Sequence, residues 1–423
     1  MNNYAAKLCL IIIIFLTIFA APSLESVGSR NIRHQSAEPK VSLNENSQAR
    51  PVPVNKSLNG TVFGYLPSWK YSDSRSSIRY ELLSHLAVFD FPADPSGNIT
   101  YPDMWPWTDV IDSAHAKGVK VIMTVTNTDS TQIHQILTNN DVKKKTFLHI
   151  KNIITTFNLD GVNIDFESLK RSDRNSAVNN YMRELTAQLH RELPGSEVSF
   201  AGPPVNWGGW NFKGLADACD YIFVMGYDYF DAKSRVSGPS ASLNGSYYSV
   251  ESTLLSTVFG YGEVTASNPR KLILGVPYYG YHWITETGEP QAFNLQFVES
   301  TTYSTVIQEA GRQKLKRFWD RINNVPWYRY QQDGQWHQVW YEDSKSIGMK
   351  YDYAISKNLR GVGIWALGFD GNRPELWREI AKRFHFGYLT TMAALPPDRI
   401  DRPFDVKTFV PKTIQPRSGK KGA

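Results

Sequence analysis

The stretch Asp160-Gly-Val-Asn-Ile-Asp-Phe-Glu167 decides the fold. It predicts a strand that carries Asn163, Asp165 and Glu167 at every second position. Because side chains alternate faces along a strand, these three project together, while the apolar residues between them project the other way. Carboxylates on one face of a buried strand are costly unless they do chemistry. We therefore interpret this strand as part of an active site rather than as a solvated strand face.

Short apolar runs recur along the chain, with helical patterns between them. The predicted strands are Val62–Leu66, Leu83–Phe91, Val119–Val125, Leu159–Phe166, Val198–Ala201, Tyr221–Tyr227, Leu272–Tyr278 and Val362–Ala366. Between two of them, Val178–Leu193 carries apolar residues at helical spacing. Alternating strands and helices predict an α/β fold, and eight such units predict a closed (β/α)8 TIM barrel. An open doubly wound sheet is the alternative, but no Gly-rich phosphate loop follows the first strand.

The seventh and eighth predicted strands are separated by more sequence than one helix fills. Residues 283–343 hold aromatic and β-branched residues on both sides of Asp333-Gly334, which predicts a hairpin. We expect a small α+β insertion subdomain over 283–343, and a barrel formed by residues 59–282 and 344–387. An insertion after the seventh strand would lie at the C-terminal rim, where barrel active sites are found.

The two ends of the chain differ in composition from its middle. Residues 1–22 predict a secretory signal peptide, with Lys7 before the apolar run Leu8–Ala20 and small residues after it. An uncleaved membrane anchor is the alternative. Residues 23–58 predict a flexible polar leader, and residues 388–423 a basic, Pro-rich tail. We expect a secreted or cell-envelope protein that has no membrane contact after signal cleavage.

The distribution of charge limits the binding partners that we expect, and the cysteine content limits the disulfides. The formal net charge is +6, and residues 388–423 alone contain seven basic and three acidic residues. The remaining body is near neutral, which argues against nucleic acid as a partner, while the basic tail favours association with an anionic cell wall. Cys9 lies in the predicted signal and Cys219 stands alone, so we expect no disulfide. No metal-ligand spacing occurs, and we expect neither a metal nor a cofactor.

Five motifs follow one another in the order of the predicted barrel strands. They are Gly64-Tyr-Leu-Pro-Ser-Trp69, Asp160–Glu167, Met225-Gly-Tyr-Asp228, Gly275-Val-Pro-Tyr-Tyr-Gly280 and Gly363-Ile-Trp365. Over residues 60–387 the chain thereby resembles glycoside hydrolase family 18, the chitinase-type family with DxxDxDxE and MxYD signatures. The segments His337–Asp343 and Trp365–Asp370 resemble the branch of chitobiase-like enzymes and bacterial cell-wall N-acetylglucosaminidases.

The resemblance implies a catalytic set for substrate-assisted hydrolysis, in which the 2-acetamido oxygen of the sugar attacks the anomeric carbon. Glu167 would be the general acid and then the base. Asp165 would orient the acetamido N–H and stabilise the cationic intermediate, and Tyr227 would hold the acetamido oxygen. No cofactor takes part in this chemistry.

The same resemblance implies a set of substrate-binding residues. They are Tyr65, Asn163, Met225, Asp228, Trp365 and Thr124. Trp365 would stack under a sugar ring and Asp228 would hydrogen-bond the sugar or the leaving group, whereas core packing is an equal alternative for Met225. Asn163 departs from the family, which has an aspartate there, and Thr124 keeps a hydroxyl where the family has a serine. Asp160 either supports the site or fixes the start of its strand.

These observations predict an exported retaining glycosidase that cleaves β-1,4 linkages of N-acetylglucosamine-containing glycans. Chitin, chitooligosaccharides, peptidoglycan and N-glycan cores all present the required acetamido sugar, and the sequence leaves the choice among them open. It also leaves open exo or endo action and the oligomeric state. The alternative class is a non-catalytic chitinase-like lectin, but such lectins typically lose the acid that Glu167 provides here.

Overall fold

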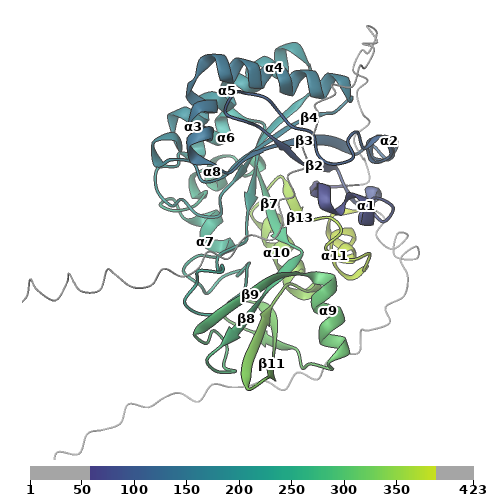
Figure 1. Ribbon diagram of the computed structural model, residues 1–423, viewed down its shortest axis with the longest axis vertical. Helices are drawn as coiled ribbons and strands as arrows, with labels where there is room; N and C mark the ends of the chain where they lie inside the picture. Colours follow the sequence, from purple (N-terminus) through teal and green to yellow (C-terminus); the bar gives the residue numbers. More distant parts are fainter. Residues whose placement is uncertain (1–57, 387–423) are drawn as a thin grey trace, which may run out of the picture. The chain divides into compact units, whose positions relative to one another are not determined.

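A closed barrel of eight parallel strands forms the centre of the structure, a computed structural model that describes residues 58–386 (Figure 1). The barrel strands are β1 (Thr61–Pro67), β2 (His85–Pro92), β3 (Lys120–Asn127), β4 (Gly161–Phe166), β5 (Glu197–Gly202), β6 (Tyr221–Met225), β7 (Leu272–Pro277) and β13 (Gly361–Trp365). The predicted TIM barrel is confirmed, and each predicted strand overlaps one of these. The predicted signal peptide, most of the leader, and the tail lie outside the described residues.

Helices connect the barrel strands and cover the outside of the barrel (Figure 1). They are α1 (Tyr71–Ser74), α2 (Thr108–Ala116), α3 (Ser130–Thr138), α4 (Asn140–Thr156), α5 (Ser176–Glu192), α6 (Phe212–Ala218), α7 (Val250–Leu255), α8 (Gly262–Ser267), α10 (Ser344–Ser356) and α11 (Glu375–Phe384). Short 3-10 helices occur at Ser68–Lys70, Tyr80–Leu82, Arg171–Asp173 and Pro269–Lys271. Asp129 and Asn139 cap α3 and α4 by accepting hydrogen bonds from first-turn backbone N–H groups.

The residues of β4 alternate between two cores, as the sequence pattern predicted. Val162, Ile164 and Phe166 are buried in the outer core, between the barrel and its helices. Asn163 and Asp165 point the other way, into the barrel, where aromatic residues such as Phe63 and Phe223 form the inner core. The two polar side chains are therefore buried in apolar surroundings. A polar group costs free energy there unless it has a hydrogen-bond partner.

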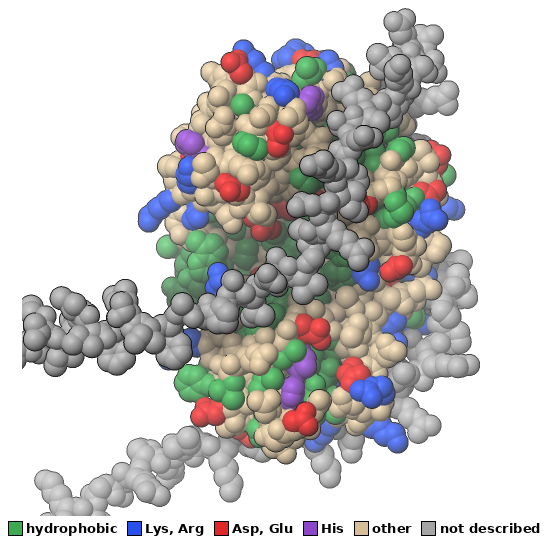
Figure 2. Space-filling model, viewed as in Figure 1, with side chains coloured by type: hydrophobic (Ala, Val, Ile, Leu, Met, Phe, Trp, Pro, Cys, Tyr) green, Lys and Arg blue, Asp and Glu red, His purple; other side chains and the backbone are tan. Residues whose placement is uncertain are grey.

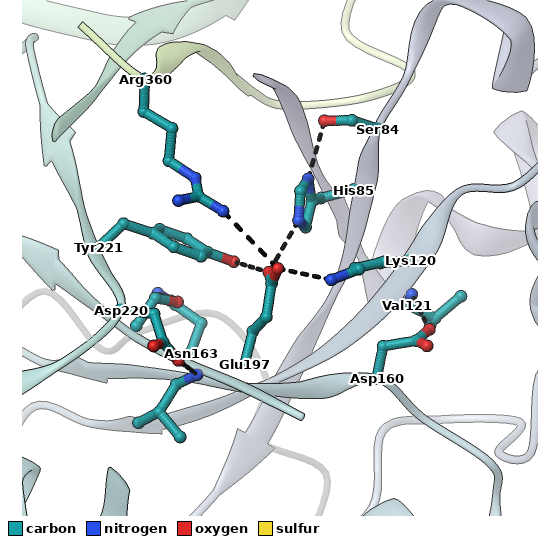
Figure 3. Close-up of polar contacts among 12 residues, drawn as sticks. Ser84, His85, Lys120, Val121, Asp160, Asn163, Glu197, Asp220, Tyr221 and Arg360 are labelled. Atoms are coloured by element: carbon teal, nitrogen blue, oxygen red, sulfur yellow. Dashed lines mark hydrogen bonds and ion pairs between the residues drawn. The ribbon is translucent and has the colours of Figure 1, made fainter. Parts of the chain in front are cut away.

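An ion-pair network closes the barrel at the N-terminal ends of its strands (Figure 3). Glu197 lies at its centre, with its carboxylate 2.8 Å from His85 Nε2 and 2.6 Å from Lys120 Nζ. The Tyr221 hydroxyl donates to the same carboxylate at 3.1 Å, and Arg360 lies 3.6 Å away. Burial alone would raise the Glu197 pKa, but the hydrogen bonds and charges of His85 and Lys120 outweigh burial and hold that pKa well below its usual range.

A five-stranded antiparallel sheet is inserted between the last two barrel strands, with strand order β10-β11-β12-β8-β9. Its elements are β8 (Tyr279–Thr285), β9 (Asn294–Thr302), α9 (Tyr303–Arg312), β10 (Phe318–Asp320), β11 (Val325–Gln332) and β12 (Gln335–Trp340). The predicted hairpin at Asp333-Gly334 is confirmed, because Gln332 pairs with Gln335 across it. The sheet begins at Tyr279, just before the predicted boundary at 283, so its first strand leaves the barrel rim directly.

Among residues 58–386, no helix combines the length and the apolar character that crossing a bilayer requires.

Candidate active site

A cavity of about 540 Å³ opens at the C-terminal ends of the barrel strands. Figure 2 shows hydrophobic side chains gathered in a hollow across the middle of the face in view. Seven of the nine predicted site residues line the cavity: Tyr65, Asp165, Glu167, Met225, Tyr227, Asp228 and Trp365. Residues from the ends of β1, β4, β6 and β13 thus converge on one space, as the barrel geometry requires.

The two acids of the signature lie in surroundings that favour their protonated forms. Asp165 is 7% exposed, and its Oδ1 has no hydrogen-bond partner among the described residues. Burial raises the pKa of Asp165 well above its usual value, and the charges of Glu167 and Asp90 raise it further. Burial and the charge of Asp228 raise the pKa of Glu167. The pair can therefore hold a proton at a pH where an exposed carboxyl has lost it.

Asn163 and Thr124 do not line the cavity. Both are fully buried one layer beneath it, and they lie side by side in the register of β3 and β4. Asn163 accepts a 2.8 Å hydrogen bond from the Tyr65 hydroxyl and donates one of 2.9 Å to Ser199 Oγ. Thr124 Oγ1 has no partner within residues 58–386. Any effect of Asn163 on a ligand is therefore transmitted by residues above it, such as Tyr65.

Tyr227 is almost fully buried beside the acids and follows β6 at the wall of the cavity. Burial raises the Tyr227 pKa well above its usual value, and nearby Tyr65, Asp228, Asp165 and Glu167 add to this. The phenol is therefore protonated at neutral pH and can donate a hydrogen bond into the cavity.

Asp228 is held in place by hydroxyl groups from two parts of the chain. Its Oδ1 accepts hydrogen bonds from Ser240, at 3.0 Å, and from the hydroxyls of Tyr279 and Tyr281. The two tyrosines belong to β8, the strand that begins the inserted sheet. The insertion thus fixes the orientation of a carboxylate at the mouth of the barrel, which the motif around Asp228 did not reveal.

An aromatic floor lies beneath the cavity. Trp365 packs edge-on against Tyr65 and Phe89, with ring centroids 5.5 and 4.8 Å apart. Trp365 keeps part of its surface open to the cavity. Such a ring presents an apolar face on which a sugar ring can stack.

Sequence reasoning missed several residues of the cavity. Trp207 and Trp210 come from the loop after β5 and line one side, and Trp207 is 55% exposed. Arg174 and Asp231 also line it. Their signal was available, because each follows a predicted barrel strand, where TIM-barrel site residues occur. Asp90 does not line the cavity, but its charge acts on Asp165, and it had no such signal, since its strand reads as continuous.

Asp160 lies at the opposite end of β4 and serves the strand rather than the cavity. Its Oδ2 accepts a 2.7 Å hydrogen bond from the backbone N–H of Val121 and lies 2.9 Å from His115 Nε2. Of the two interpretations of Asp160, the structural one is confirmed. Among the described residues, no cluster of three or more His, Cys, Asp or Glu side chains could hold a metal ion.

The sequence model of "Glycosyl hydrolases family 18" matches residues 61–370, most of the described chain. The chain belongs to glycosyl hydrolase family 18. The match spans all eight barrel strands and ends before α11, the helix that follows the last of them. It therefore includes every residue that lines the cavity.

Relatives of this family 18 chain fall into two groups. Human di-N-acetylchitobiase is 32% identical over 237 residues, which cover 51% of this chain and 59% of the relative. The cortical fragment-lytic enzyme of Bacillus subtilis is 25% identical over 320 residues, 72% of this chain and 68% of the relative. The match thus spans somewhat more than half the length of the chitobiase. Both groups agree with the branch that the sequence motifs indicated.

A solved structure confirms the fold. The family 18 chitinase from Cycas revoluta, in complex with (GlcNAc)3, superposes with a TM-score of 0.66 at 17% identity, covering 76% of this chain and 99% of the chitinase.

Proposed function

We propose that this protein is a retaining glycosidase that hydrolyses β-1,4 linkages of N-acetylglucosamine-containing glycans. One observation carries the proposal: Asp165, Glu167 and Tyr227 line the same cavity, where burial lets the two acids retain one proton between them and keeps the Tyr227 hydroxyl protonated. With that proton on Glu167, Asp165 is ionised. A carboxyl that keeps its proton near neutral pH is suited to act as a general acid. A binding protein has no need to hold two carboxyls in a buried site.

Each residue has one task in the proposed reaction. The acetamido oxygen of the sugar attacks the anomeric carbon, the glycosidic bond breaks, and the Glu167 proton passes to the leaving oxygen. The Tyr227 hydroxyl donates to the acetamido oxygen, and ionised Asp165 accepts from the acetamido N–H. The resulting oxazolinium ion is positive, so the Asp165 carboxylate stabilises it. Water then attacks the anomeric carbon and gives its proton to Glu167.

The shape of the site supports a glycan longer than one sugar. Trp365 provides the floor beneath the reacting ring, while Trp207 extends the cavity along the loop after β5. Trp207 packs against Tyr248, which in turn contacts Tyr247, a residue that is 73% exposed. These rings form a shelf on which further sugars can stack.

The names of the relatives support two substrate classes. Chitobiase points to chitooligosaccharides, and the cortical fragment-lytic enzyme points to peptidoglycan fragments. Together with the predicted signal peptide, they support action outside the cytoplasm, in the envelope or in the medium. The basic tail over 388–423 is proposed to hold the enzyme to anionic wall polymers.

The test is hydrolysis of fluorogenic chitobioside and chitotrioside by the wild-type protein and by Glu167→Gln. The variant keeps the shape of the side chain but has no proton to give, so we expect the rate to fall about 10²–10⁴-fold. A product profile on chitohexaose and on purified peptidoglycan strands then distinguishes the substrates. Micromolar oligosaccharide binding without turnover by the wild type would instead indicate a lectin.

A further inference from the structure

Asp90 is a half-buried carboxylate on β2 that no family motif accounts for. Its Oδ2 accepts a 2.7 Å hydrogen bond from Thr126 Oγ1 on β3. Thr126 is in turn the direct partner of Asp165 in the register of β3 and β4. One threonine thus lies between Asp90 and Asp165, and the Asp90 carboxylate faces the interior of the barrel.

A local irregularity of β2 brings Asp90 to this position. Leu86 and Val88 point outward into the core beneath the helices, and strict alternation would send Asp90 the same way. The pairing of β2 with β3 shifts register between Val88 and Phe91, and Phe91 rather than Asp90 returns to the outer core. The extra residue turns Asp90 toward the site, as bulges near active sites do.

The neighbourhood of Asp165 lacks the charge that an aspartate at position 163 would supply. Asn163 is neutral, and both ends of its amide are occupied, by Tyr65 and by Ser199. Asp90 approaches Asp165 from a different strand and carries the kind of charge that Asn163 lacks.

We propose that Asp90 is a positioning residue for the reaction. Its carboxylate, on β2, supplies the negative charge that is absent at position 163, and it thereby controls the proton that Asp165 and Glu167 share. The inference rests on the proposed function. Asp90 does not line the cavity and would not touch the sugar. It acts on Asp165 through space and through Thr126, and its charge also favours the positive intermediate.

The titratable and charged groups around the pair agree with this role. Asp90 and Glu167 are the carboxylates whose charges raise the pKa of Asp165, and Asp228 is the one that acts on Glu167. The phenols of Tyr65 and Tyr227 also lie close to the acids, and Arg174 lines the same cavity. Burial raises the pKa of Asp90 itself, and the hydrogen bond from Thr126 offsets only part of that rise.

The experiment is the pH dependence of kcat/KM on chitotrioside for Asp90→Asn. The amide still accepts from Thr126, but its charge is gone, so the acid pair binds its shared proton less tightly. We expect the pH–rate bell to move to lower pH and its maximum to fall about 3- to 30-fold. The double variant Asp90→Asn/Asn163→Asp restores a charge beside Asp165, and we expect it to return the bell toward the wild-type position.

Further variants test whether the shift of the pH–rate bell is specific to Asp90. Asp112→Asn removes one exposed carboxylate on α2 and should leave the bell in place. Thr126→Val should move the bell in the same direction as Asp90→Asn, and it replaces that variant if the latter fails to fold. An unmoved bell in Asp90→Asn, or a moved bell that Asn163→Asp does not restore, overturns the inference. If Glu167→Gln retains wild-type activity, the proposed function itself fails.

Discussion

The Tyr65 hydroxyl donates a 2.8 Å hydrogen bond to the side-chain oxygen of Asn163, although the two residues are 98 positions apart. Asn163 in turn donates a hydrogen bond to Ser199, so one hydrogen-bonded relay joins β1, β4 and β5 beneath the cavity. All three residues are buried. A buried relay of this kind is stable only while every member keeps its partner. It fixes the layer of the barrel interior beneath Asp165 and Glu167.

Replacing Tyr65 by Phe should destabilise the protein. The Asn163 oxygen would remain buried without its donor, which costs about 1–3 kcal/mol in the free energy of unfolding. Urea denaturation measures this loss. Tyr181→Phe is the matched control, because the Tyr181 hydroxyl is also buried but has no partner among the described residues. Equal losses in both variants would show that the hydrogen bond to Asn163 contributes nothing.

Replacing Asp228 by Asn should change the pH dependence of the reaction. The charge of Asp228 raises the pKa of Glu167, so its removal lowers that pKa and lets the proton leave at a lower pH. We expect the kcat/KM profile to move to lower pH. Tyr281→Phe is the control, since it removes one hydrogen bond to Asp228 but keeps the charge. A profile that moves equally in both variants would contradict the electrostatic explanation.

Trp207→Ala should affect long substrates more than short ones. Its ring is 55% exposed at the side of the cavity, where a sugar beyond the reacting unit would stack. Loss of about 1 kcal/mol of stacking corresponds to a roughly fivefold rise in KM for chitohexaose, with little change for chitobiose. Steady-state kinetics on both substrates measure the difference. Phe293→Ala removes a similarly exposed ring that does not line the cavity, and should change neither KM.

Glu197→Gln should reduce stability in a pH-dependent way. The pKa of Glu197 is depressed in the folded protein, so its stabilising effect is present above the unfolded pKa of about 4.3 and is lost as pH falls toward the folded pKa. At pH 7 we expect the variant to lose about 2 kcal/mol in the free energy of unfolding, because His85 and Lys120 lose a charged partner.

Denaturation of this variant at several pH values is the measurement, with Glu263→Gln, at an exposed position of α8, as the control. The difference between wild type and Glu197→Gln should shrink below about pH 4. A difference that stays constant, or grows on acidification, would mean that the carboxylate is not held in its charged form by the network.

Periodicity predicted the barrel well because each element carries its own signal. Strand alternation placed Asn163 and Asp165 inside the barrel, and the helical pattern over 178–193 became α5. Asp90 escaped the same reasoning for a physical reason. A single register shift reverses the face of every residue beyond it, and nothing in the pattern of β2 shows the shift.

The amino-acid sequence by itself determined the eight strands, the family and the strand that carries Asp165 and Glu167, since these follow from local spacing along the chain. Only the tertiary structure decided the charge around those acids. Asp90 reaches them from β2, and Tyr279 orients Asp228 from the inserted sheet. Electrostatic and hydrogen-bond energies depend on distances through space, and those distances exist only once strands far apart in the chain have closed into a barrel.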